Sequence, residues 1–141
     1  MLDSLMKFGA YRVNYFKPFM KNSPEAFGFY IRAEIEQGQA YSHMAKHQLY
    51  VGLDLIQRIL GMQNLVGIYI DIDCLSNLLR PAYQQMKRDI LSGYFQKILI
   101  LEKDAIEGCP GAVADLYELA DRVGGLELLS WQDSRLVETI V

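Results

Sequence analysis

Two short segments of this chain are apolar almost without interruption, and they restrict the possible fold more than any other feature. The segments are VGIYI at residues 66–70 and KILIL at residues 97–101. A strand in a half-solvated hairpin alternates apolar and polar residues, whereas a strand that is covered on both faces is apolar throughout. The two segments therefore predict strands inside a sheet that has helices on both sides.

The order of the remaining elements points to the same architecture. We expect strands near residues 27–33, 65–71, 96–102 and 125–130, separated by helices near residues 40–61, 77–92 and 111–123. Leu53, Ile56 and Leu60 recur at helical spacing, and Pro81 is tolerated in a first helical turn. Strands that alternate with helices of this length pair in parallel. The prediction is an α/β fold with a layered, mainly parallel sheet flanked by helices; the segment from residue 133 on is expected to form a short helix or strand.

We divide the chain into an N-terminal arm, residues 1–24, and an α/β domain, residues 25–141, because Asn22, Ser23 and Pro24 form a turn signal. The net charge of −3 divides into +3 in the arm and −6 in the domain. The basic and aromatic residues of the arm are Lys7, Phe8, Tyr11, Arg12, Tyr15, Phe16, Lys17, Phe19 and Lys21. Such a mixture can follow nucleic acid by charge and base stacking. Aromatic residues more often serve burial, so packing of the arm onto the domain or onto a second subunit is the favoured alternative.

Residues 80–104, RPAYQQMKRDILSGYFQKILILEKD, lead from Arg-Pro through an amphipathic helix into an apolar strand that is followed by an acid. This run resembles the catalytic domain of serine recombinases, the resolvase and invertase family, in which an arginine, a helix ending near a glycine, an apolar strand and an aspartate follow one another. Arg80, Gly93 and Asp104 match that pattern. The segment FYIRAE at residues 29–34 stands where the family has Tyr-x-Arg-Val-Ser, and GIYIDID at residues 67–73 is similar to its second strand and acid. The resemblance covers roughly residues 27–131 and implies a resolvase-like catalytic domain fold.

The resemblance also implies a site. Its members here are Arg32, Asp71, Arg80 and Asp104, with Arg32 and Arg80 as the contacts to DNA phosphates. In the family a serine hydroxyl attacks a DNA phosphodiester while clustered arginines neutralise the charge that builds on the phosphate, and no metal or cofactor is needed.

Two parts of that machinery are missing. Glu34 occupies the place of the serine, and the segment DAIEG at residues 104–108 occupies the place of Asp-Arg-x-x-Arg, so two active-site arginines are absent. We therefore expect a recombinase-like domain, associated with DNA recombination in a mobile element, that has become a pseudoenzyme. Arg32 and Arg80 could still hold a sulfate or phosphate. The favoured alternative is that Glu34 pairs with one of these arginines. The partners implied are DNA and either a second copy in a dimer or another recombinase subunit.

Two functions of other classes stay open. Asp71, Asp73 and Asp104 follow predicted strands, so they could hold Mg²⁺ for phosphoryl transfer or nuclease chemistry, although acids at such places are commonly turn or helix-capping residues. Alternatively, the chain is an oligomeric interaction module that makes its contacts through the arm. His43 and His47 have metal-ligand spacing without a visible third ligand, and exposed histidines are favoured.

The location of the protein is predicted from what the sequence does not contain. No segment reaches the roughly 18 apolar residues of a membrane span. Cys74 and Cys109 stand far apart, outside any zinc-binding spacing, and are expected to be free thiols. These features predict a cytoplasmic protein without a membrane partner.

Overall fold

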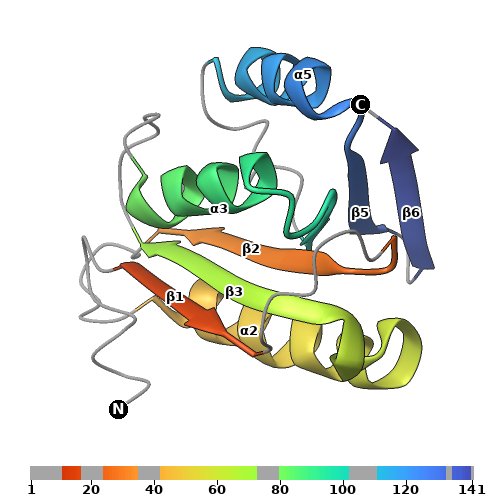
Figure 1. The fold of residues 1–141 in the computed structure, drawn as a ribbon. Helices are drawn as coiled ribbons and strands as arrows, with labels where there is room; N and C mark the ends of the chain where they lie inside the picture. Colours follow the sequence, from red (N-terminus) through yellow and green to blue (C-terminus); the bar gives the residue numbers. More distant parts are fainter. Residues whose placement is uncertain are drawn as a thin grey trace.

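The computed structural model describes residues 11–16, 24–34, 42–72, 80–101, 111–132 and 135–140. Within these ranges six strands form one mixed sheet in the order β1-β3-β2-β4-β5-β6 (Figure 1). The strands are β1 (Tyr11–Tyr15), β2 (Phe27–Ala33), β3 (Leu65–Ile72), β4 (Lys97–Ile100), β5 (Glu127–Gln132) and β6 (Arg135–Ile140). The inner strands β3, β2, β4 and β5 pair in parallel, and the edge strands β1 and β6 pair antiparallel. The predicted α/β fold with a mainly parallel sheet is confirmed.

Helices cover both faces of this sheet (Figure 1). Helix α2 (His43–Leu55) lies on one face, and α3 (Pro81–Leu91) and α5 (Ala112–Val123) lie on the other. Helix α2 continues into a π-helical turn, Ile56–Leu60, which closes with a bond from Gly61 N to Ile56 O at 2.6 Å. A short 3₁₀ turn, Met62–Asn64, then leads into β3. None of the described helices has the length and apolar character needed to cross a membrane.

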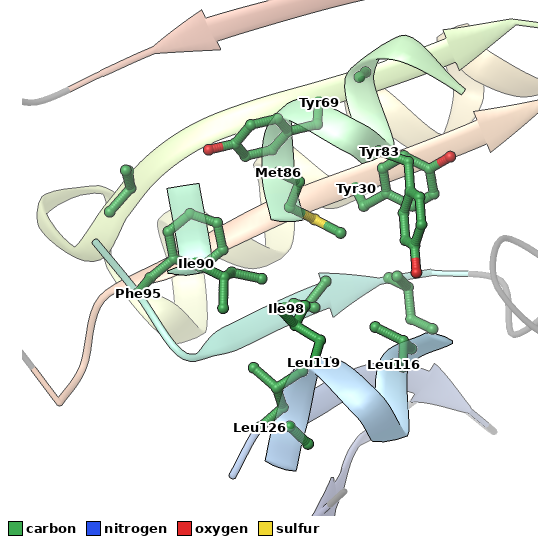
Figure 2. Packing of buried hydrophobic residues seen from close by; sticks show 14 of the residues in the cluster. Tyr30, Tyr69, Tyr83, Met86, Ile90, Phe95, Ile98, Leu116, Leu119 and Leu126 are labelled. Atoms are coloured by element: carbon green, nitrogen blue, oxygen red, sulfur yellow. The ribbon is translucent and has the colours of Figure 1, made fainter. Parts of the chain in front are cut away.

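The strands have two buried faces, and alternate residues belong to different hydrophobic clusters. In β2, Phe29 and Ile31 pack towards α2, whereas Tyr30 packs towards α3 and α5. Figure 2 shows the cluster on the side of α3 and α5, in which Met86 and Ile90 of α3 pack together with Leu116 and Leu119 of α5. All seven residues of β2 and all eight of β3 are buried. This is the physical reason why these segments are apolar on both sides.

The sequence predicted the inner elements closely and missed one outer element. The strand expected at residues 27–33 is β2, and the segment after residue 133 forms the strand β6. Strand β1 was not predicted, although Tyr11, Val13 and Tyr15 alternate with polar Arg12 and Asn14. It lies in the region defined as the arm and pairs with β3. The division of the chain at residue 24 stays a prediction.

A buried carboxylate connects β1, β3 and α3. The Tyr15 and Tyr69 hydroxyls both donate to Asp89 Oδ2 at 2.7 Å, and Gln85 Nε2 donates to Asp89 Oδ1 at 3.0 Å. Burial, together with the bond to Asp89, raises the pKa of Tyr15 to about 12 and raises the pKa of Tyr69 further. Tyrosine hydroxyls are protonated in neutral solution, and these shifts keep both phenols protonated in alkaline solution as well. Their hydrogen bonds to Asp89 hold α3 against the edge of the sheet.

Gly52 allows α2 to approach β2 closely, because a methyl group at this position would overlap the ring of Phe29. In an open helix, Gly→Ala stabilises by about 1 kcal/mol. Here we expect Gly52→Ala to lower the free energy of unfolding by about 1–3 kcal/mol, since the fully buried Phe29 ring must move. Urea unfolding followed by circular dichroism measures this change. Lys46→Ala, on the exposed face of the same helix, should stay within about 0.5 kcal/mol of the parent protein. Stabilisation by Gly52→Ala would contradict this account of the packing.

Candidate functional site

The carboxyl ends of β2 and β3 bring together two residues that are far apart in the sequence. Arg32 and Asp71 are Cα partners in the parallel pair. In-register neighbours on parallel strands project from the same face of a sheet. This face is the one covered by α3, because Ile31, Ala33, Ile70 and Ile72, which flank the two residues, pack towards α2. The carboxyl edge of parallel strands is where open α/β proteins bind ligands.

Asp71 caps helix α3 from outside the helix. Its carboxylate accepts hydrogen bonds from the backbone N–H groups of Ala82 at 2.9 Å and Tyr83 at 3.0 Å. Arg80, at the N-cap position, makes no side-chain capping bond, and Pro81 has no N–H to satisfy. The first turn of a helix carries unsatisfied donors and a partial positive charge. Asp71 therefore accepts hydrogen bonds from two of these donors and places a negative charge beside the positive end of the helix. The carboxylate is buried, at 1% exposure.

The Tyr30 hydroxyl links Asp71 to Arg80. It donates to Asp71 Oδ2 at 3.0 Å and accepts from Arg80 Nη1 at 3.4 Å. Burial raises the pKa of Tyr30 well above its usual value, and the nearby negative charge of Asp71 raises it further. Arg80 is the largest fully buried side chain among the described residues, at 1% exposure. The three groups form a buried polar cluster beneath the start of α3.

Arg32 forms an ion pair with Glu34. Arg32 Nη2 lies 2.9 Å from Glu34 Oε1, and the exposed fractions of the two side chains are 9% and 47%. The expected pairing of Glu34 with one of the two arginines is thus confirmed for Arg32. The exposed end of the pair is the carboxylate, so a phosphate that approaches Arg32 from solvent meets a negative charge.

Two residues of α2 hold this strand end in place. Ser42 Oγ donates to Glu34 O at 2.8 Å and accepts from Ala45 N at 3.2 Å, so one hydroxyl caps α2 and anchors residue 34. Gln48 Nε2 donates to Arg32 O at 3.3 Å. Ser42 is 1% exposed. Although it is a serine close to position 34, its buried and doubly bonded hydroxyl is poorly placed to attack a phosphate.

The other residues singled out from the sequence do not join this cluster in the described parts of the chain. Asp73, Cys74, Asp104 and Cys109 lie outside the described residues. His43 and His47 lie on the exposed side of α2. Within the described ranges, no group of three or more His, Cys, Asp or Glu side chains is placed to hold a metal ion. Asp71 already uses at least three of its roughly four acceptor sites on Tyr30 and α3.

Tyr30 and Ser42 are among the members of the site that the sequence did not single out. Tyr30 stands two residues before Arg32, so the period of a strand places both on one face. That spacing could have identified it. Ser42 could have been recognised as a helix-capping residue before the apolar periodicity of α2. Its bond to Glu34 joins segments eight residues apart and has no sequence signal.

Comparison with known proteins gives one similar structure. No protein-family model matches this sequence, and no curated protein matches it. The fold is similar to the N-terminal catalytic domain of TP901-1 integrase, with 17% sequence identity and a TM-score of 0.49 over 79% of this chain and 81% of that chain.

We expect Asp71→Ala to lower the free energy of unfolding by about 3 kcal/mol, because it leaves buried donors on Tyr30 and at the start of α3 without their acceptor. Urea unfolding measures the loss. The matched control is Asp54→Ala, which removes an exposed carboxylate paired with Arg58 and should cost less than about 1 kcal/mol. The magnesium alternative makes the opposite prediction. Mg²⁺ would then stabilise the parent protein, and removing one of several clustered acids would stabilise the metal-free form.

Proposed function

We propose that this chain is a resolvase/invertase-type recombinase-like domain that acts in association with DNA and does not carry out strand exchange. The observation that carries the proposal is the Arg32–Glu34 ion pair. By the sequence resemblance, it puts a carboxylate at the position of the nucleophilic serine and neutralises one of the cations that would hold the phosphate. Arg32, Asp71, Arg80 and Asp104 are then the remnant of the family's site.

The chemistry of a carboxylate argues against strand exchange. Attack by Glu34 on a phosphodiester would produce a labile acyl phosphate, whereas exchange requires a stable covalent intermediate. Electrostatic stabilisation of the developing charge is usually the largest catalytic contribution. In this chain that stabilisation is reduced, because two arginines of the family's site are absent and Glu34 adds a negative charge. The Tyr30 hydroxyl does not replace the serine in this proposal, because Tyr30 is fully buried and its hydroxyl is bonded to Asp71 and Arg80 within the cluster.

Arg32 supports the retained part of the function, which is contact with phosphate, because Arg80 is only 1% exposed and its guanidinium group is bonded to Tyr30 within the buried cluster. Guanidinium groups bind phosphate oxygens with charge-assisted hydrogen bonds. Arg32 lies at the carboxyl end of β2, on the side of the sheet that α3 covers. We propose DNA as the macromolecular partner, a second copy of the chain or another recombinase subunit as the protein partner, and the cytoplasm as the location.

Glu34→Gln should strengthen DNA binding, because it removes the negative charge beside Arg32 and keeps the size of the side chain. Fluorescence anisotropy with labelled duplex DNA should show a severalfold lower Kd and a salt dependence of log K that is steeper by about 0.9 for one added phosphate contact. Glu118→Gln, on the exposed side of α5, changes the net charge equally and serves as the control. If both variants gain the same affinity for DNA, the change in net charge explains the effect. The result would then not support a phosphate contact at Arg32.

Supercoiled plasmid should remain intact when incubated with the protein, with or without Mg²⁺, and quenched in detergent. Glu34→Ser should not restore cleavage, because the two arginines remain absent. Protein-linked DNA formed by the parent protein would overturn the inactive assignment. Cleavage that needs Mg²⁺ and disappears in Asp71→Ala would favour the carboxylate enzyme instead.

A further inference from the structure

A groove of about 700 Å³ runs between the edge strand β1 and helix α3. We call it the β1–α3 groove, and the residues that matter for its chemistry are Tyr11, Arg12, Tyr15, Pro81, Gln85 and Arg88. Strand β1 is at one end of the strand order, so its outer side has no neighbouring strand among the described residues (Figure 1). The groove therefore combines side chains from two elements that the sequence separates by more than sixty residues.

The charge of the groove is positive and is not neutralised by carboxylates. Arg12 Nε donates to Asn14 Oδ1 at 2.7 Å, and Arg88 donates through Nε and Nη2 to Gln85 Oε1 at 3.3 and 2.7 Å. These acceptors are neutral amides, and neither arginine has a carboxylate partner in the described part of the chain. No residue that lines the groove is acidic.

Two lysines elsewhere on the domain are paired with carboxylates. Lys87 pairs with Asp115 at 2.8 Å, and Lys97 lies within 3.5 Å of carboxylates of Glu25 and Glu127. The nearby carboxylate of Asp89 is 4% exposed and is bonded to Tyr15, Tyr69 and Gln85. The two arginines of the groove thus present positive charge to whatever binds there, in a chain with a net charge of −3.

The groove also presents aromatic rings. Tyr11 and Tyr15 are 58% and 45% exposed. Alternation along β1 puts them on one side of the strand with Val13, which packs against the cluster under α3. Arg12 and Asn14 project from the other side, because their Cα partners Ile70 and Ile68 pack towards α2. Arg12 therefore borders the groove from the outer edge of β1. The ring of Tyr15 is held by its bond to Asp89 and by an edge-on contact with Tyr69, with centroids 6.3 Å apart. A ring fixed in this way loses little freedom when a planar group stacks on it.

One end of the groove lies beside the candidate site. Tyr11 is the Cα partner of Asp71, and Pro81 directly follows Arg80. Arg88 lies seven residues after Pro81 in α3, which corresponds to about 10 Å along the helix. A chain of phosphates that follows α3 from Arg88 would therefore arrive next to Arg80 and Asp71.

We infer that the β1–α3 groove binds single-stranded nucleic acid, with its bases against Tyr11 and Tyr15, one phosphate at Arg88 on the side of α3 and another at Arg12 on the outer edge of β1. Proteins that bind single strands combine a positively charged groove with aromatic side chains on which bases stack. A duplex supplies the phosphates but keeps the faces of its bases covered, so the exposed tyrosines favour an unpaired strand. The inference rests on the proposed function only for the biological setting; binding in the groove does not require the recombinase-like site.

Fluorescence anisotropy with a labelled oligothymidylate tests the inference, using Arg12→Gln, Arg88→Gln and Tyr11→Ala. Each arginine variant should weaken binding severalfold and reduce the slope of log K against log salt by about 0.7 for one lost phosphate contact. Tyr11→Ala should weaken binding about tenfold through lost stacking. The control is Arg58→Gln, which removes an exposed cation paired with Asp54 on α2 and should leave Kd and slope unchanged. Circular dichroism checks that each variant is folded.

The outcomes separate this inference from the proposed function. Three results would overturn the inference that single-stranded nucleic acid binds in the groove. They are lack of binding by the parent protein, an equal loss of affinity in Arg58→Gln, and an unchanged affinity in Tyr11→Ala. Equal weakening of duplex and single-strand binding by Arg88→Gln and Tyr11→Ala, or competition by thymidine monophosphate as strong as by the oligomer, would also overturn this inference. If Glu34→Gln strengthens duplex binding while the groove variants change nothing, the proposed function stands without the groove. If only the groove variants lose affinity, the results support binding in the groove and argue against a phosphate contact at Arg32.

Discussion

Burial of both faces of β2, β3 and β4 is the constraint on which the rest of this structure depends. A strand covered by α2 on one side and by α3 and α5 on the other has no place for an unbonded polar group. Polar side chains therefore gather at the ends of the strands and at the edge of the sheet. Those that are buried, Tyr30, Asp71 and Asp89 among them, are bonded to neighbouring elements.

Helix α3 connects the two surfaces discussed above. A carboxylate from β3 caps its first turn, and Asp89 near its other end receives hydroxyl donors from β1 and β3. Hydrogen bonds to ionised groups are stronger than those between neutral groups. The helix is thus attached to the sheet at both ends by charged acceptors in addition to its apolar face. Its start borders the site at Arg32 and Arg80, and its exposed side forms one wall of the β1–α3 groove.

The arginine at the strand ends and the arginines of the groove differ in their partners. Arg32 is paired with a carboxylate, whereas Arg12 and Arg88 are bonded to neutral amides. At the strand ends, Arg32 is paired with the carboxylate of Glu34, which reduces its attraction for another anion. In the groove, Arg12 and Arg88 are oriented by neutral amides, so their bonds position the guanidinium groups without cancelling their charge. The proposed loss of strand exchange at one place is compatible with the proposed contact with nucleic acid at the other, because binding needs charge and shape whereas catalysis also needs a nucleophile.

The sequence by itself determined the α/β class and the approximate positions of β2, β3, β4, β5 and the three helices, because continuous apolar strands and helical periodicity are local patterns. It also identified Arg32, Asp71 and Arg80 as candidates and predicted a partner for Glu34. Only the tertiary structure decided that Asp71 caps α3, that the Tyr30 hydroxyl joins Asp71 to Arg80, and that β1 completes a groove with α3. These features depend on distances between residues 11 to 74 positions apart in the chain, and no local pattern encodes such contacts.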